Sequence, residues 1–272
     1  MKIDISKATF IIPIRLESDD RIRNVITSTC FLLENFDTNL IIKEVDSESI
    51  FEQQALPQIK EYLGDVSRIK HIFEKSDSLE FHRQKVLNEM IMDTSTEIVV
   101  NYDCDVVLPI HSYQDAYNML INGECDIVYP YGQGKYQKQV QATDDLVSEF
   151  LSNDFDFSIL DEKSNESTSD YGWVQFFNRQ VYIDGGLENE NFVAYAPEDK
   201  ERFYRFNTLG YNIVRVEDFV YHLEHKRGPN SWFTNPYSSH NQSVWQEIQE
   251  MNKQQLLEYY SKQEYLKKYV SI

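Results

Sequence analysis

The 272-residue sequence is short of basic residues. It contains 26 lysines and arginines against 45 aspartates and glutamates, which gives a formal net charge of −19. A surface with this charge repels the phosphates of nucleic acids and the headgroups of anionic lipids. The composition therefore excludes a binder of bulk nucleic acid, and any ligand that carries phosphate requires something in its site to offset the charge.

Cysteines and long apolar runs are also scarce. Cys30, Cys104 and Cys125 are an odd number without a C-x-x-C pair, which argues against a disulfide framework and against a thiolate zinc site. No run approaches the roughly 20 apolar residues of a membrane-spanning helix, and the acidic N-terminal residues do not resemble a signal peptide. We expect a cytoplasmic protein with reduced thiols and no transmembrane segment.

The residues that are abundant predict a packed α/β domain. Hydrophobic residues make up 41% and aromatic residues 14% of the chain, which is enough to form a core. In the first half, short apolar runs alternate with segments of helical periodicity, as in strands joined by crossover helices. We predict strands at 8–14, 40–46, 69–73 and 97–102, and helices at 19–34, 50–63 and 81–92.

The second half includes a strongly acidic segment. Residues 144–170 contain nine acids and one lysine, and the Ser-, Asn-, Asp- and Glu-rich second half of this segment predicts a mobile loop or insertion. Further strands are predicted at 126–131, 174–177, 211–216 and 219–222, and helices at 112–121 and 197–209. Residues 236–272 are predicted as a C-terminal helical extension. Its lysines 262, 267 and 268 allow a weak peripheral contact with membranes.

An acidic triplet follows the fourth predicted strand. Asp103, Cys104 and Asp105 come directly after Tyr102. In an extended chain residues i and i+2 point to the same side, so both carboxylates can bind one hard divalent cation. Ligands of open α/β sheets bind at the carboxyl ends of strands, where this triplet falls. The alternative is a pair of solvated turn acids, which are common at strand ends.

A second group of polar residues follows the last predicted strand. The imidazole of His222 or of His225 suits a manganese-like ion beside two carboxylates. Lys226 and Arg227 come next, and cations beside a metal stabilise a diphosphate leaving group. The alternative is a hydrogen-bonded histidine at the end of a strand, followed by a solvated turn.

Two adjacent acids begin a predicted helix. Pro197 suits the first helical position, which places Glu198 and Asp199 in the first turn. Acids in a first turn complement the helix dipole, each by about 0.3–1 kcal/mol. A carboxylate at the rim of a pocket can also take a proton from an attacking hydroxyl. Both roles are open for this pair.

Several short motifs occur in an order that is found in a known enzyme family. They are Phe10-Ile11-Ile12-Pro13-Ile14-Arg15, Arg83 with Asn88, Asp103-Cys104-Asp105, Tyr171-Gly172-Trp173-Val174, Asp184-Gly185-Gly186, Tyr195-Ala196-Pro197-Glu198-Asp199, and His222. Over about residues 8–230 this order resembles β-1,4-galactosyltransferases and related galactosyl- and N-acetylgalactosaminyltransferases, which are GT-A glycosyltransferases similar to family 2.

The resemblance implies a fold and a division of the chain. The fold would be the Rossmann-like GT-A fold, with a mixed, mostly parallel central sheet flanked by helices. Residues 1–235 would form the glycosyltransferase domain, with a nucleotide-binding half at about 1–110 and an acceptor and metal half at about 111–235. The helical extension at 236–272 would follow this domain.

The resemblance also implies a role for each matching residue. Asp105 would ligate the metal with His222, and Asp103 would lie nearer the ribose or a metal-bound water. Glu198 would hold sugar hydroxyls, and Asp199 would be the catalytic base. The other matching residues would contact the nucleotide sugar: Pro13, Ile14 and Arg15 beside the nucleotide, Glu44 or Asp46 at uracil or ribose, Arg83 at the diphosphate, and Trp173 and Tyr195 on sugar faces.

Taken together, these roles imply an inverting glycosyltransferase that uses Mn²⁺ or Mg²⁺ and moves a sugar from a UDP-sugar to a hydroxyl of a glycan or glycoconjugate. Galactose and an N-acetylhexosamine are the favoured sugars. Two positions depart from the family: Tyr195-Ala196-Pro197 replaces Trp-Gly-Gly beside the sugar, and Phe219 replaces a methionine that ligates the metal.

Two other functions are compatible with paired acids. A nucleotidyltransferase that makes sugar nucleotides also uses them with a metal, but the sequence has no glycine-rich loop after its first strand. A noncatalytic module that binds glycans is the other alternative.

Overall fold

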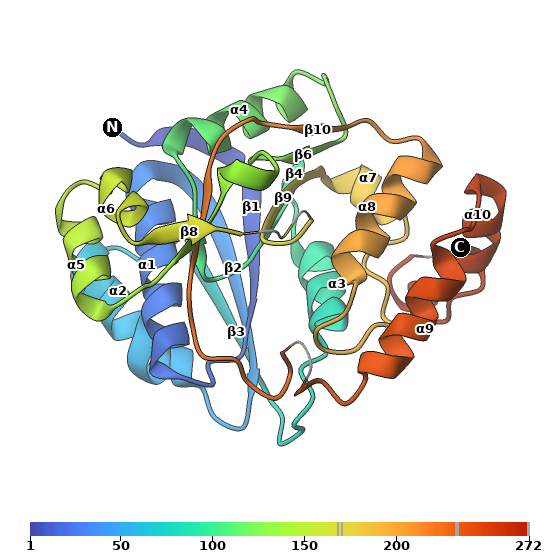
Figure 1. Cartoon of the computed structure of the whole chain (residues 1–272), viewed down its shortest axis with the longest axis horizontal. Helices are drawn as coiled ribbons and strands as arrows, with labels where there is room; N and C mark the ends of the chain where they lie inside the picture. Colours follow the sequence, from blue (N-terminus) through green and yellow to red (C-terminus); the bar gives the residue numbers. More distant parts are fainter. Residues whose placement is uncertain (168, 170, 232–233, 271–272) are drawn as a thin grey trace.

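The computed structural model describes residues 1–167, 169, 171–231 and 234–270, and these form a mixed sheet with helices on both sides (Figure 1). The strand order is β10-β6-β9-β4-β1-β2-β3. Neighbouring strands are parallel, except that β9 runs antiparallel to β4 and to β6. The predicted mostly parallel α/β sheet is confirmed.

The strands of this sheet lie close to the predicted ranges. They are β1 (Ile3–Ile14), β2 (Phe36–Asp46), β3 (Ile69–Lys75), β4 (Ile98–Tyr102), β6 (Ile127–Tyr129), β9 (Val174–Asn178) and β10 (Ile213–Arg215). A second, smaller sheet contains β5 (Val106–Val107), β11 (Val220–Leu223), β7 (Gln137–Val140) and β8 (Ser164–Glu166), in that order.

The helices lie on two sides of the central strands in Figure 1. On the left are α1 (Asp19–Asn35), α2 (Leu56–Leu63), α5 (Asp144–Ser152) and α6 (Phe157–Asp161). On the right are α3 (Arg83–Asp93), α7 (Arg179–Asp184), α8 (Glu198–Leu209), α9 (Ser238–Ile248) and α10 (Lys253–Ser261), and α4 (Ile110–Ile121) lies above. Short turns of other helical types are Phe51–Ala55, Gly134–Tyr136 and Leu266–Lys268.

The first strand and helix show why the sequence pattern was informative. β1 has a neighbour on each side, and Phe10, Ile11 and Ile12 are completely buried, as a continuous apolar run in a parallel sheet requires. The strand begins at Ile3, before the predicted start, because Ile3 pairs with Phe36 of β2. Ser18 then caps α1 by accepting a hydrogen bond from the backbone N–H of Arg21.

The smaller sheet brings the two predicted metal-binding segments together. β5 follows the acidic triplet directly, and it pairs antiparallel with β11, so that Val106 lies opposite His222. The backbone N–H of Leu223 donates to the carbonyl of Asp105 at 2.7 Å. Residues more than a hundred positions apart in the chain therefore meet at one sheet edge.

The acidic segment is not the loop that its composition predicted. Residues 144–166 fold into α5, α6 and β8, while Thr168 and Asp170 lie outside the described residues. Thr143 caps α5, and Phe150 is completely buried against Phe31 of α1. The acids occupy the outer face of an amphipathic helix, so charge density hid the apolar face beneath it.

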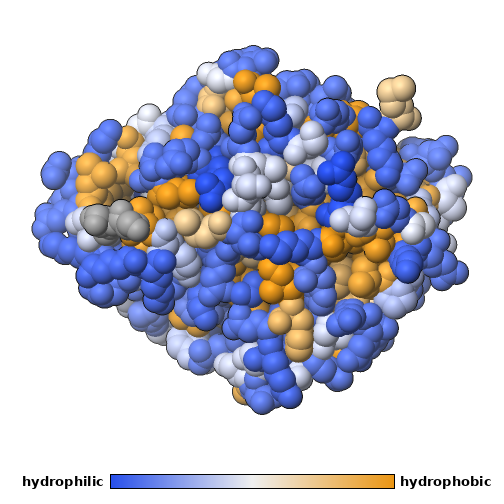
Figure 2. Space-filling model, turned by 180° about the vertical axis from the view of Figure 1, so that it is seen from behind, coloured by the Kyte–Doolittle hydropathy of each residue, from blue (hydrophilic) through white to orange (hydrophobic). Residues whose placement is uncertain are grey.

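The C-terminal helices pack against α8 (Figure 1). The Tyr204 hydroxyl of α8 donates to the carbonyl of Met251 at 2.6 Å, and the Tyr260 hydroxyl of α10 donates to Glu201 of α8 at 2.5 Å. Among the described residues no helix is both long and apolar enough to cross a bilayer. Hydrophilic residues cover most of the face shown in Figure 2, with hydrophobic residues in smaller patches between them.

Candidate active site

Three ligating side chains meet at the edge of the smaller sheet. The ligand atoms of Asp105, His222 and His225 all lie within 4.8 Å of one another. Nε2 of His225 is 3.0 Å from Oδ2 of Asp105, and Nε2 of His222 is 3.7 Å from Oδ1. Metal–ligand bonds of about 2.1 Å separate ligand atoms by up to roughly 4.2 Å. One oxygen and two nitrogens at this spacing fit a divalent ion of the Mn²⁺ type after small side-chain rotations.

The charges in this cluster suit metal binding. Burial raises the pKa of Asp105, but His222 and His225 outweigh it and hold that pKa well below its usual range. Burial lowers the pKa of His222 to about 4, against the attraction of Asp105. At neutral pH the carboxylate is therefore ionised and the His222 imidazole is neutral, with a lone pair available to a cation.

Asp103 faces a different partner from Asp105. Nη2 of Arg83 donates to the Asp103 carboxylate and to the Asn101 side chain. Burial raises the pKa of Asp103 to about 6, and Arg83 opposes this rise. Asp103 does not belong to the close cluster of ligand atoms that the described residues form. The two acids of the triplet thus line one cavity but have separate contacts.

Asp199 lies in the first turn of α8 and is held by a buried arginine. Arg202, one turn later, donates Nη2 to Oδ1 of Asp199 and Nη1 to Glu188 at 2.8 Å. Oδ2 lies toward Gly172, where an added Cβ would be 3.0 Å from it. One carboxylate oxygen is therefore engaged by Arg202, while the other lies on the side of Gly172, which lines the cleft.

Glu198 differs sharply from its neighbour. It is buried, and Oε2 accepts a hydrogen bond from the backbone N–H of Ala196 at 3.0 Å. Burial, and then the charge of Asp199, raise the pKa of Glu198 well above its ordinary value. A protonated carboxyl donates a hydrogen bond but does not accept a proton, so the two acids have distinct chemical capacities.

The arginine that holds Asp199 is itself fixed by a chain of contacts. Glu188 accepts from Arg202 and from the Tyr182 hydroxyl, and both Arg202 and Glu188 are buried. The Asn88 side chain accepts from the Glu188 backbone N–H at 2.7 Å and donates to its carbonyl at 3.0 Å. Asn88, which the sequence motif included without a role, thus positions Asp199 through Glu188 and Arg202.

The predicted aromatic residues both line the cleft. Trp173 has a left-handed backbone, with φ of 70°, and its ring stacks on that of His222 at 6.0 Å. Its carbonyl accepts from the backbone N–H of Asp103 at 2.9 Å. Tyr195 is 52% exposed and lies at the mouth of the cleft. The positive φ of Trp173 is a strained conformation for a non-glycine residue, and such strain is typical of functional sites.

Several predicted nucleotide contacts are engaged elsewhere. Pro13 and Arg83 line the cavity at the metal cluster, whereas Ile14 is buried in the core. Nε of Arg15 donates to the Val45 carbonyl at 2.9 Å, and Nη1 donates to the Leu79 carbonyl at 3.1 Å.

The acids at the end of β2 also lie outside the residues that line this cavity. Glu44 is completely buried, and its two oxygens accept from the Ser49 hydroxyl and from the backbone N–H of Phe51. Asp46 accepts from the backbone N–H of Ser47 at the end of the strand.

The two predicted cations after β11 differ in position. The Lys226 side chain is exposed and its backbone N–H donates to Asp20, whereas Arg227 lines the cleft.

Sequence reasoning missed one cation at the metal cluster. Arg21 of α1 lines the same cavity as Asp105 and His222. Its buried Nε has no hydrogen-bond partner among the described residues, and its charge lowers the pKa of both neighbours. The sequence did carry a signal, because a basic residue in the first turn of a helix opposes the helix dipole.

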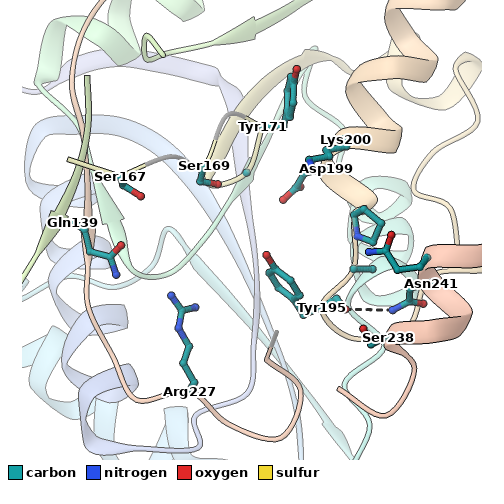
Figure 3. Close-up of a pocket in the computed structure, with 14 residues that line it drawn as sticks. Gln139, Ser167, Ser169, Tyr171, Tyr195, Asp199, Lys200, Arg227, Ser238 and Asn241 are labelled. Atoms are coloured by element: carbon teal, nitrogen blue, oxygen red, sulfur yellow. Dashed lines mark hydrogen bonds between the residues drawn. The ribbon is translucent and has the colours of Figure 1, made fainter. Parts of the chain in front are cut away.

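It also missed the part that the C-terminal helix plays. Asn241 of α9 accepts from the backbone N–H of Val193 at 3.1 Å and donates to the carbonyls of Val193 and Tyr195 (Figure 3). Asn235 donates to the same two carbonyls. The segment predicted as an extension thus holds the loop that carries Tyr195 and leads into Glu198.

Replacing Asn241 by alanine should destabilise the protein by about 1–2 kcal/mol, because the Val193 N–H loses its acceptor in a half-buried position. Urea unfolding measures this change. Gln246, exposed on the same helix, provides a matched control, and Gln246→Ala should change stability by less than about 0.5 kcal/mol. Equal effects of the two substitutions would show that Asn241 does not hold this loop.

The metal-ligand cluster, Asp199, Glu198 and the two predicted aromatic residues line a cleft that consists of two adjoining cavities. The inner cavity, of about 290 Å³, contains the metal cluster, Arg21, Arg83 and Glu198. The outer cavity, of about 530 Å³, reaches α9. Residues that line both are Gln139, Ser167, Ser169, Gly172, Tyr195, Asp199 and Arg227. The arrangement provides a cation site and a carboxylate that can take a proton, with room on either side of that carboxylate.

Solved structures of other proteins share the fold of this chain. No protein-family model and no curated protein matches the sequence. The mannosyltransferase PcManGT from Pyrobaculum calidifontis, in complex with GDP-Man and Mn²⁺, has a TM-score of 0.52 at 15% identity, over 82% of this chain and 58% of that chain. S. aureus TarS has a TM-score of 0.54 at 12% identity, over 82% of this chain and 37% of TarS.

A shorter form, S. aureus TarS 1–349 in complex with UDP-GlcNAc, has a TM-score of 0.54 at 11% identity, over 85% of this chain and 60% of that chain. The chain spans less than two thirds of the length of each of these structures. At these identities the likeness shows the fold, which is the GT-A fold that the motifs implied.

Proposed function

We propose that the protein is a metal-dependent glycosyltransferase that moves a sugar from a nucleoside diphosphate sugar, with UDP favoured, to a hydroxyl of a glycan or glycoconjugate. The observation that carries the proposal is that the cluster of Asp105, His222 and His225 lines one cleft with Asp199. The fold shared with a mannosyltransferase and with TarS supports it.

Asp105, His222 and His225 would hold Mn²⁺ or Mg²⁺, and the ion supplies Lewis-acid stabilisation of a diphosphate leaving group when it is bound. Arg21 and Arg83 line the same cavity and add positive charge there. Charge-assisted hydrogen bonds from arginine to phosphate are strong and directional. The metal ion and the two arginines would supply positive charge beside the diphosphate, although the whole chain has a net charge of −19.

The sugar would lie between the metal-ligand cluster and Asp199. Trp173 and Tyr195 offer ring faces that suit the C–H faces of a sugar, and the Glu198 carboxyl, whose pKa is raised by burial, offers a hydrogen bond to a sugar hydroxyl. Galactose or an N-acetylhexosamine remains the favoured donor sugar. The UDP-GlcNAc complex of TarS supports the second of these, and the GDP-Man complex of PcManGT supplies a competing donor class.

Asp199 would act as the base. Its Oδ1 is engaged by Arg202, and Oδ2 would take the proton of the acceptor hydroxyl as that oxygen attacks the anomeric carbon. The bond to the diphosphate breaks as the new glycosidic bond forms. Attack from the side opposite the leaving group inverts the anomeric configuration, which agrees with a base that lies between the two cavities.

A donor screen tests the function. Release of nucleoside diphosphate is measured with Mn²⁺ across UDP-galactose, UDP-GalNAc, UDP-GlcNAc, UDP-glucose and GDP-mannose. We expect release from at least one UDP-sugar, and none from Asp105→Ala. No release from any donor would contradict the transferase and leave the noncatalytic glycan-binding module, whereas pyrophosphate exchange with UTP would favour a nucleotidyltransferase.

Arg21 provides a prediction about donor binding. Arg21→Gln should weaken binding of UDP in the presence of Mn²⁺ about tenfold, since a charge-assisted hydrogen bond contributes about 1.5–3 kcal/mol. Isothermal titration measures the Kd. Arg68→Gln removes an exposed arginine that precedes β3 and lines neither cavity, so it should leave the Kd unchanged. A Kd within twofold of wild type for Arg21→Gln would exclude this contact.

A further inference from the structure

The outer cavity has features that the donor site does not explain. Asp199 lines both cavities, whereas Asp105, His222 and His225 line only the inner one, and Lys200, Ser238 and Gln242 line only the outer one. Its volume of about 530 Å³ exceeds that of the inner cavity. On the proposed function, the molecule that occupies this cavity is the acceptor, because its hydroxyl must reach Oδ2 of Asp199.

The charge of this cavity is opposite to that of the chain. Lys200 and Arg227 are its basic residues, and Asp199 is the one described carboxylate that lines it, with Oδ1 engaged by Arg202. Acids outnumber bases by 45 to 26 in the whole sequence. The excess of positive charge among the described lining residues favours an anion in this cavity.

Neither cation is used by the fold. Among the described residues, the side chains of Lys200 and Arg227 make no ion pair and no hydrogen bond. Arg227 projects into the cavity between Gln139 and Tyr195 in Figure 3. By contrast, the side chain of Lys43 pairs with Glu74, and that of Lys70 pairs with Asp93. The two unpaired cations are therefore available to a ligand.

The rest of the lining is suited to a carbohydrate. Hydroxyl and amide side chains such as Ser169, Ser238 and Gln242 offer donors and acceptors to sugar hydroxyls. Tyr171 and Tyr195 add ring faces, as sugar-binding sites commonly do. A neutral sugar would use these groups but would leave both cations without a partner.

Resting on the proposed function, we propose that the acceptor is an acidic saccharide, with a carboxylate or phosphate group that Lys200 and Arg227 bind while its hydroxyl faces Asp199. Carboxylate and phosphate share the chemistry that these cations recognise, and a guanidinium can bind either in a bidentate manner. Lys200 is the residue that separates this proposal from the donor site, because Arg227 lines both cavities.

Three soluble probes test the proposal: methyl β-glucuronide, glucose 6-phosphate and neutral methyl β-glucoside. Their binding to the protein loaded with Mn²⁺ and UDP is measured by saturation-transfer NMR titration. At least one charged probe should bind about fivefold or more tightly than the neutral probe. Comparison of the two charged probes then identifies which anionic group is preferred.

Lys200→Gln should weaken binding of the charged probe about fivefold, equivalent to about 1 kcal/mol, and change binding of the neutral probe less than twofold. Lys60→Gln is the matched control, because Lys60 is an exposed lysine of α2 that lines neither cavity. Equal binding of charged and neutral probes would overturn the proposal, as would an unchanged preference in Lys200→Gln.

Binding of UDP to the donor site is measured separately, by titrating UDP into the same protein variants. If UDP binds with Mn²⁺ but the probes show no preference for charge, the acidic acceptor is wrong and the transferase stands. If UDP does not bind in the presence of Mn²⁺, the proposed function fails as well.

Discussion

Asp199→Asn should reduce turnover about a thousandfold and leave UDP binding unchanged, since a positioned general base contributes about 10²–10⁴-fold to rate. Asparagine keeps the shape of aspartate and can still accept from Arg202 through Oδ1. It cannot take a proton at the position of Oδ2. The loss should therefore appear in kcat, and the Kd for UDP with Mn²⁺ should stay within about twofold of wild type.

Glu198→Gln is the matched control for the base. Glutamine resembles the protonated carboxyl that burial favours at this position, so this variant should keep a measurable turnover and lose mainly affinity for the donor. Retained turnover in Asp199→Asn together with its loss in Glu198→Gln would reverse the two roles. Loss of UDP binding in Asp199→Asn would show that the residue acts in donor binding instead.

Arg202→Met should lower the free energy of unfolding by about 3–5 kcal/mol, because it leaves the buried carboxylate of Glu188 without its cationic partner. Both side chains are only 1% exposed. Asp199 also loses the group that fixes Oδ1, so turnover should fall even at temperatures where the variant remains folded. Chemical denaturation and steady-state kinetics measure the two effects.

The double variant Arg202→Met/Glu188→Gln tests the cause. Removing the unpaired charge should recover part of the lost stability, since a neutral amide costs less to bury than an unpaired carboxylate. Turnover should remain low, because Asp199 is still without its partner. If Arg202→Met costs less than about 1 kcal/mol, the ion pair is not what stabilises this region.

The sheet was predictable, and the two segments proposed to bind a metal could be selected from the sequence, because their signals are local. Apolar runs such as Phe10-Ile11-Ile12 mark buried parallel strands wherever they pair. The acids at Asp103 and Asp105 follow directly from the end of β4. The sequence left His222 and His225 as alternatives, and the structure brings both to Asp105, because the chain turns back toward that carboxylate after β11.

The residues that sequence reasoning placed differently depend on long-range contacts. Arg15 follows the Pro-Ile pair of the motif, yet it donates to carbonyls 30 and 64 positions away. Glu44 ends up buried because Ser49 and Phe51 fold back over it. Arg21, in the first turn of α1, lines the same cavity as Asp105 and His222, which lie far from it in the sequence. Such contacts are fixed by packing, which local spacing does not encode.

The net charge of the chain limited its possible ligands, but the local density of acids wrongly predicted a loop. The net charge of −19 argues against nucleic acid, but residues 144–166 carry much of it on helices and a strand instead of on a loop. Within the cleft, Arg21, Arg83 and Arg227 accompany the acids. The protein therefore combines a strongly negative net charge with a cleft whose described lining includes both carboxylates and arginines.

The most direct test of this account is isothermal titration of UDP into the protein with and without Mn²⁺, repeated with Asp105→Ala. We predict binding that requires Mn²⁺ and that weakens at least tenfold in the variant, because Asp105 is the carboxylate of the metal cluster. Binding of UDP with equal affinity in the absence of metal, or no binding in its presence, would contradict a metal-dependent transferase.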